Sequence, residues 1–317
     1  MQYRILHGNK YIVGGNQLES NLIKRIDYLK NADSILPLTK GFSNDQKFVI
    51  DQRFLLRIFP MDQQVKRKIE FDTIHQLSSI SECVPKTIEF NHLEDLNKCY
   101  MIVSFLPGKD AEEALKELTT TEQYDAGYMA GNELGKLHQL VAPSHYPSWD
   151  IVKKKKSDYY LLELKNINID ENIKQLLESY IKENEDLMIG RPNTFQHDDF
   201  HPSNLLIKDK TFAGIIDFER MDWGDPIHDL QKLGFFSKQV SVEFTRGVIA
   251  GYLAGQTMDS SYFWKLYALY SAMHIVSSLV WGLKSVPETF DILLKHSLEV
   301  LEDHDNFKNT IPKWYLP

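Results

Sequence analysis

The fold of this chain is decided by the stretch Thr194-Phe195-Gln196-His197-Asp198-Asp199-Phe200-His201-Pro202-Ser203-Asn204. Two apolar runs follow it, Leu205-Leu206-Ile207 and Phe212-Ala213-Gly214-Ile215-Ile216, and Asp217 closes the second run. Both runs are rich in β-forming residues, and the polar link Lys208-Asp209-Lys210-Thr211 between them predicts a β-hairpin. Such a hairpin brings Asn204 and Asp217 side by side at its open end.

The polar residues of this stretch have the spacing His-x-Asp-x-x-x-x-Asn, formed by His197, Asp199 and Asn204. Phosphoryl transfer from a nucleotide needs a carboxylate that accepts the proton of the attacking hydroxyl, and oxygen ligands that hold Mg²⁺ against the phosphates. Asp199 fits the first role, and Asn204 with Asp217 fits the second. His197 is predicted to orient the loop by hydrogen bonding. The alternative is a set of ordinary turn and cap residues, because Asp and Asn are common in turns.

The pattern resembles the catalytic and metal-binding loops of the aminoglycoside phosphotransferase and choline kinase families, which are relatives of the protein kinases. The segment Trp223-Gly224-Asp225-Pro226-Ile227-His228-Asp229-Leu230 is similar to the Gly-Asp-Pro-x-x-Asp-Leu segment of these families. Its Asp229 is therefore expected to help orient the catalytic loop. The resemblance implies an α+β, two-lobed, protein-kinase-like fold, with an N-terminal β-sheet lobe and a mostly helical C-terminal lobe.

The N-terminal part of the chain predicts a strand, a loop, a second strand, a tight turn at Asp51-Gln52 and a third strand. A short helix from Leu18 to Leu29 is predicted before them. The loop contains Gly41 and Ser43, and its backbone N–H groups can donate to nucleotide phosphates. A plain surface turn is the alternative for this loop.

The third strand of related kinases supplies a lysine that contacts the nucleotide phosphates and pairs with a glutamate on the next helix. Arg57 stands at this position here, and arginine keeps the charge while changing the geometry of the contact. Glu70, on a helix predicted from Val65 to Leu77, is placed to pair with Arg57. An exposed glutamate is the alternative.

A buried strand starting at Tyr100 ends at Pro107-Gly108 and resembles the kinase hinge, whose backbone groups bind the purine edge. We place the lobe boundary there, so that residues 1–106 form a nucleotide-binding lobe and residues 107–317 a catalytic and substrate-binding lobe. The hinge candidates are Ser104, Phe105 and Leu106, and an ordinary core strand is the alternative for this segment.

Acidic residues of the C-terminal lobe are candidates for binding the acceptor. Family members that phosphorylate aminoglycosides line the substrate cleft with carboxylates from the end of the chain, which implies a cationic acceptor. A solvated helix end explains such a cluster equally well. The candidate residues are Glu219, Glu302, Asp303 and Asp305.

Three other features of this lobe are interpreted as structural. His138 is expected to be a buried, hydrogen-bonded histidine rather than a catalyst. The four lysines from Lys153 to Lys156 are expected to form a solvated face. The aromatic stripe from Phe263 to Trp281 is expected to be core, with contact to cofactor or substrate as the alternative.

The composition describes an ordinary soluble globular protein of 317 residues, long enough for two lobes. A net charge of −8 argues against a nucleic-acid partner. Two cysteines, Cys83 and Cys99, are too few for a disulfide framework or a zinc site. The start of the chain lacks the apolar segment of a signal peptide, and no apolar run is expected to reach membrane-spanning length. The sequence is therefore interpreted as a cytoplasmic monomer or weak homodimer without a membrane partner.

The function expected from the motifs and the resemblance is transfer of the γ-phosphate of ATP or GTP, with Mg²⁺, to a hydroxyl group of a small molecule. The leading acceptor class is an aminoglycoside-type antibiotic, which would confer antibiotic resistance. The alternatives are a macrolide kinase, a metabolic kinase acting on a choline-, homoserine- or methylthioribose-like acceptor, and a pseudokinase module that binds nucleotide without transfer.

Overall fold

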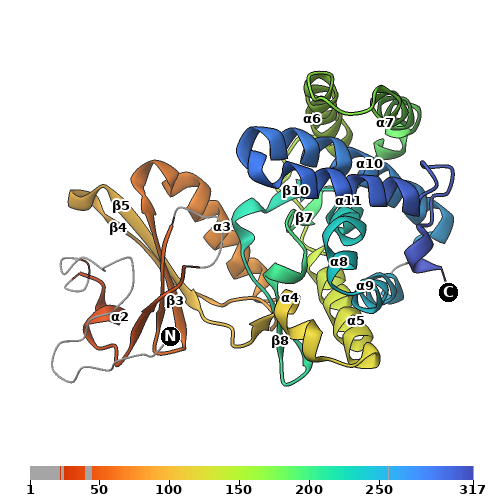
Figure 1. The fold of residues 1–317 in the computed structure, drawn as a ribbon. Helices are drawn as coiled ribbons and strands as arrows, with labels where there is room; N and C mark the ends of the chain where they lie inside the picture. The colour runs from red at the N-terminus through yellow and green to blue at the C-terminus, as the bar shows by residue number, and fades with distance from the viewer. Residues whose placement is uncertain (1–21, 23–24, 40–44, 256, 317) are drawn as a thin grey trace. The chain divides into compact units, whose positions relative to one another are not determined.

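The computed structural model describes residue 22 and residues 25–39, 45–255 and 257–316. The chain divides into two compact units, residues 1–107 and 108–317 (Figure 1). Half of the helix predicted from Leu18 to Leu29 lies outside the described residues, and α2 (Asp27–Lys30) falls at its end. The predicted phosphate-loop residues Gly41 and Ser43 also lie outside the described part of the chain.

The N-terminal unit contains a five-stranded antiparallel sheet with the strand order β1-β2-β3-β5-β4. Its strands are β1 (Ile35–Pro37), β2 (Gln46–Ile50), β3 (Phe54–Pro60), β4 (Thr87–Leu93) and β5 (Lys98–Ser104). Helix α3 (Gln64–Leu77) follows β3. The expected sequence of strands, turn and helix is therefore present.

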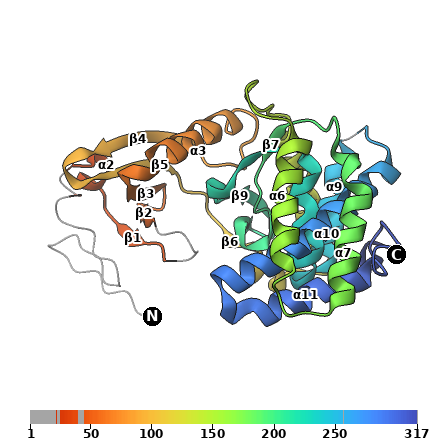
Figure 2. The ribbon, with the colours of Figure 1, turned by 90° about the horizontal axis from the view of Figure 1, so that it is seen from above.

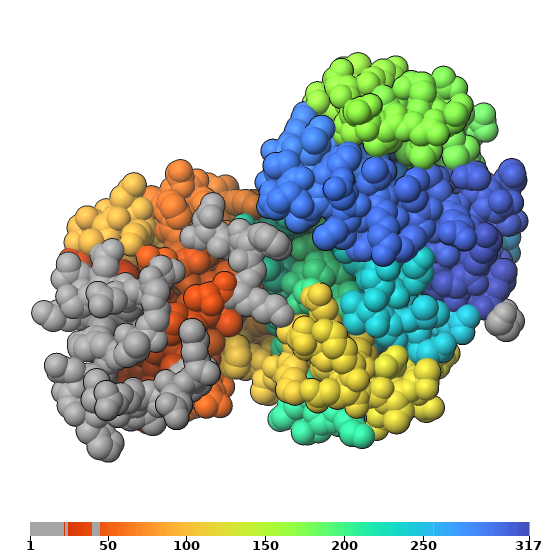
Figure 3. Space-filling model, in the orientation of Figure 1, coloured from red at the N-terminus to blue at the C-terminus, as the bar shows by residue number. Residues whose placement is uncertain are grey.

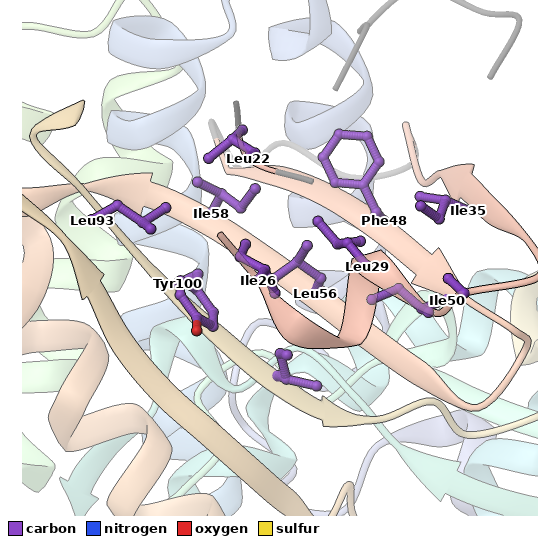
Figure 4. Packing of buried hydrophobic residues seen from close by; sticks show 12 residues of the cluster. Leu22, Ile26, Leu29, Ile35, Phe48, Ile50, Leu56, Ile58, Leu93 and Tyr100 are labelled. Atoms are coloured by element: carbon purple, nitrogen blue, oxygen red, sulfur yellow. The ribbon is translucent and has the colours of Figure 1, made fainter. Parts of the chain in front are cut away.

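The turn between β2 and β3 has Asp51 and Gln52 at φ values of 52° and 53°. Positive φ at both central residues is the geometry whose twist matches paired antiparallel strands. The Asp51 carboxylate also accepts the backbone N–H of Ser34 at 2.7 Å, which ties the turn to the residue before β1. One buried apolar cluster packs on this sheet and includes Phe48 and Leu56 (Figure 4).

The C-terminal unit is mostly helical. Its longer helices are α5 (Thr120–Leu137), α6 (Trp149–Leu164), α7 (Glu171–Asn184), α9 (Val242–Ala254), α10 (Ser260–Ser285) and α11 (Phe290–Asp303). The same unit contains the short helices α4 (Ala111–Ala114) and α8 (Lys238–Val240) and a π-helix at Leu233–Ser237. Two small sheets carry the site: β6 (Lys109–Asp110) with β8 (Leu205–Lys208) and β9 (Thr211–Ile215), and β7 (Thr194–Gln196) with β10 (Asp222–Gly224).

Helices α5 and α9 approach so closely that their backbones touch. A Cβ atom added at Gly127 would lie 2.1 Å from the carbonyl oxygen of Phe244, and one added at Gly131 would lie 2.0 Å from that of Val248. The small residues on one face of α5 therefore serve this close approach. Helix α5 begins with a capping box, in which Thr119 and Glu122 bond each other's backbone N–H groups.

Helix α10 is the central helix of this unit and packs against α6, α7 and α11 (Figure 2). By length and composition it could cross a membrane, so the expectation that no apolar run reaches that length was wrong. In the structure 83% of the most apolar 18-residue stretch of α10 is buried inside the protein. The helix is apolar because it fills the core, and most of the aromatic stripe, including Tyr267 and Tyr270, is core as expected.

Candidate active site

The hairpin β8–β9 places Asn204 beside Asp217. Leu205 pairs with Ile215 in the register, and the N–H of Ile216 donates to the carbonyl of Asn204 at 3.0 Å. The turn residues Asp209 and Lys210 both have positive φ, as a two-residue hairpin turn requires. The hairpin predicted from the sequence is therefore present, and its open end joins the two proposed metal ligands.

Asp229 fixes the backbone of the loop that precedes this hairpin. Its buried carboxylate accepts the N–H of His197 and the N–H of Asp198, each at 2.7 Å. It also lies 3.0 Å from His138 Nε2, and His138 Nδ1 lies 3.0 Å from the hydroxyl of Tyr252. His138 is thus a satisfied buried histidine, as expected, and three donors converge on one carboxylate.

His197 connects the loop to the segment that carries Asp217. Its Nε2–H donates to the carbonyl of Ile216 at 2.9 Å, and its Nδ1 accepts the N–H of Asp199 at 3.3 Å. Burial lowers the pKa of His197, so the neutral imidazole is favoured. With both nitrogens engaged in the backbone, the side chain orients the loop.

The side chains of a lysine, an arginine, a histidine and Asn204 lie around Asp199. The Nζ atom of Lys232 lies 2.5 Å from Oδ1, Nε2 of His201 lies 3.5 Å from it, and Nε of Arg220 lies 3.9 Å from Oδ2. Burial alone raises the pKa of Asp199, but the hydrogen bond to His201 and the charge of Lys232 outweigh this and hold the pKa well below its ordinary value. The carboxylate is therefore ionised at neutral pH. One-fifth of the side chain is exposed.

Lys232 is a functional candidate that the sequence analysis missed. Besides Asp199 it reaches the carbonyl of Asp198 at 2.7 Å, so one buried ammonium clamps two consecutive residues of the loop. Asp198 has φ of 55°, a conformation that costs a non-glycine residue energy and that these bonds help to hold. The sequence did offer one signal. Lys232 follows Asp229 by three residues, about one helical turn, so a helix would place both side chains on the same side, toward the loop.

The residues proposed to hold Mg²⁺ fit a hard cation. The side-chain nitrogen of Asn204 donates to the carbonyl and to Oδ2 of Asp199, at 3.0 and 3.1 Å, which leaves its amide oxygen as the available ligand. The carboxylate of Asp217 accepts no hydrogen bond and forms no ion pair with any residue that the structure describes. The described residues hold no group of three or more His, Cys, Asp and Glu suited to a metal. A carboxylate, an amide oxygen and substrate phosphates are the usual Mg²⁺ ligands in such sites.

The N-terminal unit contains a separate buried cluster of four charges around Arg57. Arg57 donates to Glu70 Oε1 at 2.5 Å and to Asp45 Oδ2 at 2.7 Å, so the predicted pairing of Arg57 with Glu70 is present. Arg67 of α3 completes the cluster through Asp45 at 2.7 Å and Glu70 at 3.0 Å. Asp45 and Arg67 were missed, because their partnership depends on how β3 and α3 pack.

The three hinge candidates differ in how their backbone N–H groups are used. The N–H of Ser104 donates to the carbonyl of Lys86, and that of Phe105 donates to the carbonyl of Arg53, each at 2.8 Å. The N–H of Leu106 has no acceptor among the residues described. Leu106 is therefore the hinge candidate whose backbone is available to a base edge.

The acidic candidates near the C-terminus are largely paired with lysines. Asp303 lies 2.5 Å from Lys238, and Asp305 lies 3.8 Å from Lys308. Glu302 is exposed at the end of α11, and Glu219 is partly exposed on the turn after Asp217. The pairing favours the solvated-end explanation for the residues at the chain terminus.

Residues 34–264 match the family model of the phosphotransferase enzyme family, APH, and the chain therefore belongs to this family. No curated protein matches the chain. Among solved structures, the gentamicin complex of APH(2")-IIa is 16% identical with a TM-score of 0.64, over 90% of this chain and 97% of that one. ADP-bound APH(2'')-Ib is 15% identical with a TM-score of 0.64, over 95% and 100%.

A third solved structure is the GDP complex of aminoglycoside 2'-phosphotransferase-IIIa, 17% identical with a TM-score of 0.63, over 85% of this chain and 92% of that one. At these identities the likeness establishes the fold. The expected family and the α+β, kinase-like fold class are therefore confirmed.

Proposed function

We propose that this protein transfers the γ-phosphoryl group of ATP or GTP to a hydroxyl group of a small molecule. The observation that carries the proposal is the ionised Asp199, bonded to the amide of Asn204 on the hairpin that also carries the unpaired Asp217. Membership of the phosphotransferase family supports it. Solved structures of similar fold include ADP, ATP and GDP complexes.

In the proposed reaction Asp199 accepts a hydrogen bond from the acceptor hydroxyl and takes its proton as the new O–P bond forms. The bond between the γ-phosphorus and its bridging oxygen breaks, and the nucleoside diphosphate leaves. A carboxylate with a low pKa is a weak base, so its main contribution is to orient the hydroxyl. Mg²⁺, bound by Asn204 and Asp217, would neutralise charge on the phosphates.

We assign nucleotide binding to residues 1–106 and catalysis with acceptor binding to residues 107–317. In the first, Leu106 offers a backbone donor, and the buried cluster of Arg57 and Glu70 orders the sheet against α3. Gly41 and Ser43 stay candidates for phosphate contact. A cytoplasmic location, where nucleotides are available, fits this activity.

The class of the acceptor can be inferred from similar structures and from the charges around Asp199. Solved structures of similar fold include complexes with gentamicin, streptomycin and hygromycin B, which keeps an aminoglycoside among the candidates. The cations around Asp199 and the paired acidic residues at the chain end favour the alternative, a metabolic kinase with a non-cationic acceptor.

The test is a nucleotide-turnover assay with an acceptor panel of kanamycin, a macrolide, choline, homoserine and glycerate. We expect Mg²⁺-dependent release of nucleoside diphosphate with at least one acceptor, and its loss in Asp199→Ala. Tight binding of nucleotide without transfer to any acceptor would support the pseudokinase alternative and contradict this proposal.

A further inference from the structure

Lys153 of α6 was expected on a solvated face, and the structure buries it. Only 8% of the residue is exposed, and its Nζ atom lies 2.5 Å from Nε2 of His228 and 5.5 Å from the centre of the Trp149 ring. No carboxylate of a described residue lies within 4.0 Å of Nζ. A buried ammonium without an anion at ion-pair distance is costly, and burial lowers the pKa of Lys153 to about 7.

His228 connects this lysine to the catalytic loop. Its Nδ1 lies 3.5 Å from Oδ1 of Asp198, the residue before Asp199. Lys232 reaches the same loop from its own segment. Two buried lysines and a histidine therefore surround a short stretch of chain beside the proposed catalytic carboxylate.

Helix α10 adds a buried imidazole to this region. His274 is 8% exposed, and its Nε2 has no hydrogen-bond partner among the residues described. Its ring packs edge-on against Phe235 of the π-helix at 4.7 Å, and one turn earlier Tyr270 packs against His228 at 5.3 Å. Burial lowers the pKa of His274, and the charges of Lys232 and Lys153 lower it further.

The π-helix lies between this imidazole and the catalytic loop. Phe236 contacts His274 with a ring separation of 5.9 Å and His201 of the loop with a separation of 5.6 Å. Single π-helical turns occur often at functional sites. In the space-filling view the blue-green to cyan surface, from about residue 200 to residue 250, lies between the blue ridge of α10 and α11 and the yellow surface of the segment after residue 107 (Figure 3).

We propose that Lys153, His274 and Lys232 bind an anionic group of the acceptor, a carboxylate or a phosphate monoester, beside the hydroxyl that Asp199 orients. The inference rests on the proposed function and names the substrate class of the same site. The anion would supply the countercharge that Lys153 lacks and accept a hydrogen bond from Nε2–H of His274. A polycationic acceptor would instead meet Lys232 and Arg220 next to Asp199.

The first test compares acceptors that differ in one charged group: glycerate and glycerol 3-phosphate against glycerol, and homoserine against its alcohol analogue. We expect the kcat/KM of an anionic acceptor to be at least about tenfold above that of its uncharged or cationic counterpart, because a charge-assisted hydrogen bond contributes a free energy of this size. Lys153→Met should raise KM for that acceptor about tenfold or more, with the KM for nucleotide unchanged. Turnover confined to neutral or cationic acceptors would overturn the inference while leaving the proposed function intact.

A matched control is available on the same helix. Lys155 is exposed and has no ion pair in the described chain, so Lys155→Met changes the net charge equally without touching the buried group. It should leave KM for every acceptor unchanged. An equal effect of both variants would show that net charge, rather than the site, is responsible.

The second test measures binding without turnover. With AMP-PNP and Mg²⁺ at saturation, glycerate or glycerol 3-phosphate should raise the Tm of the wild-type protein and should not raise that of Lys153→Met. The variant without any anion should be at least as stable as the wild type, because it removes a buried charge that lacks a partner. Failure to bind AMP-PNP would contradict the proposed function. Binding of AMP-PNP with no response to either anion would contradict the anion site alone.

Discussion

The two units of this protein each bury a cluster of charges, and the clusters differ in balance. In the N-terminal unit Arg57 and Arg67 face Asp45 and Glu70, and each cation contacts both carboxylates. In the C-terminal unit Lys153 faces an imidazole and no carboxylate within ion-pair distance in the described chain. A balanced cluster serves the fold, whereas an unbalanced one is expected to bind a ligand that supplies the missing charge.

The largest effect is expected at the catalytic carboxylate. Asp199→Ala should lower kcat by about 10² to 10⁴, the usual contribution of a positioned proton acceptor. Asp217→Ala should lower turnover to a similar extent by removing a proposed Mg²⁺ ligand. Steady-state assays with circular dichroism as a folding control measure both, and turnover like that of the wild type in either variant would rule out that assignment.

Breaking the balanced cluster should be the largest change in stability. Asp45→Ala leaves the buried Arg57 and Arg67 facing the single carboxylate of Glu70, and removing one partner of a buried ion pair costs about 3–5 kcal/mol. The free energy of unfolding in urea measures this. The control is Asp72→Ala, which breaks an exposed pair with Lys68 and should cost less than about 1 kcal/mol. Equal costs would mean that the buried cluster has no special structural role.

The buried Lys153, which lacks a carboxylate at ion-pair distance in the described chain, should make the free energy of unfolding depend on pH. The groups that face Lys153 are His228, Lys156, Lys232, Asp198 and Asp222. With a folded-state pKa of about 7, Lys153 is largely neutral in the folded protein above that pH but still binds a proton in the unfolded chain up to its ordinary pKa. The unfolded state then binds more protons, so this group makes stability rise as pH increases.

The measurement is the difference in unfolding free energy between the wild type and Lys153→Met from pH 7 to pH 10. The unfolding free energy of the wild type, relative to that of the variant, should rise by at most about 1.4 kcal/mol for each unit of increasing pH. A difference that is constant with pH would show that Lys153 keeps its proton in the folded protein.

The smallest effect is expected at Asp229. Asp229→Asn keeps the shape of the side chain but weakens the bonds to the N–H groups of His197 and Asp198. Bonds to charged groups contribute about 1.5–3 kcal/mol, so activity should fall by about tenfold to a hundredfold and stability by a similar free energy. Loss of activity without loss of stability would assign Asp229 a direct chemical role.

Local patterns in the sequence were sufficient to predict the elements that form the site. The hairpin from Leu205 to Ile215 is set by residues close in sequence, so its geometry follows from turn chemistry and β-propensity. The loop around Asp199 was predicted from its motif, although Asp229 and Lys232 hold it from the segment after β10. The pairing of Arg57 with Glu70 came from the family resemblance. These three predictions needed no knowledge of how distant helices pack.

The residues that were missed are those whose surroundings depend on packing. Lys153 looks like any member of a run of four lysines, but it shares one face of α6 with Trp149, Ser157 and Leu161, all buried at a spacing of four residues. That periodicity was the available signal. His228 lies next to the helix that carries His274 because α10 packs against the segment after β10, which no local pattern reveals.

The central claim is that Asp199 directs transfer of phosphate to an acceptor hydroxyl, and a single-turnover assay with nucleotide labelled at the γ-phosphate tests it most directly. In the wild-type protein with Mg²⁺ and the acceptor panel, the label should move to an acceptor. In Asp199→Asn it should stay on the nucleotide, which should still bind with unchanged affinity. Transfer at the wild-type rate in Asp199→Asn, or no transfer by the wild type to any acceptor, would contradict the account.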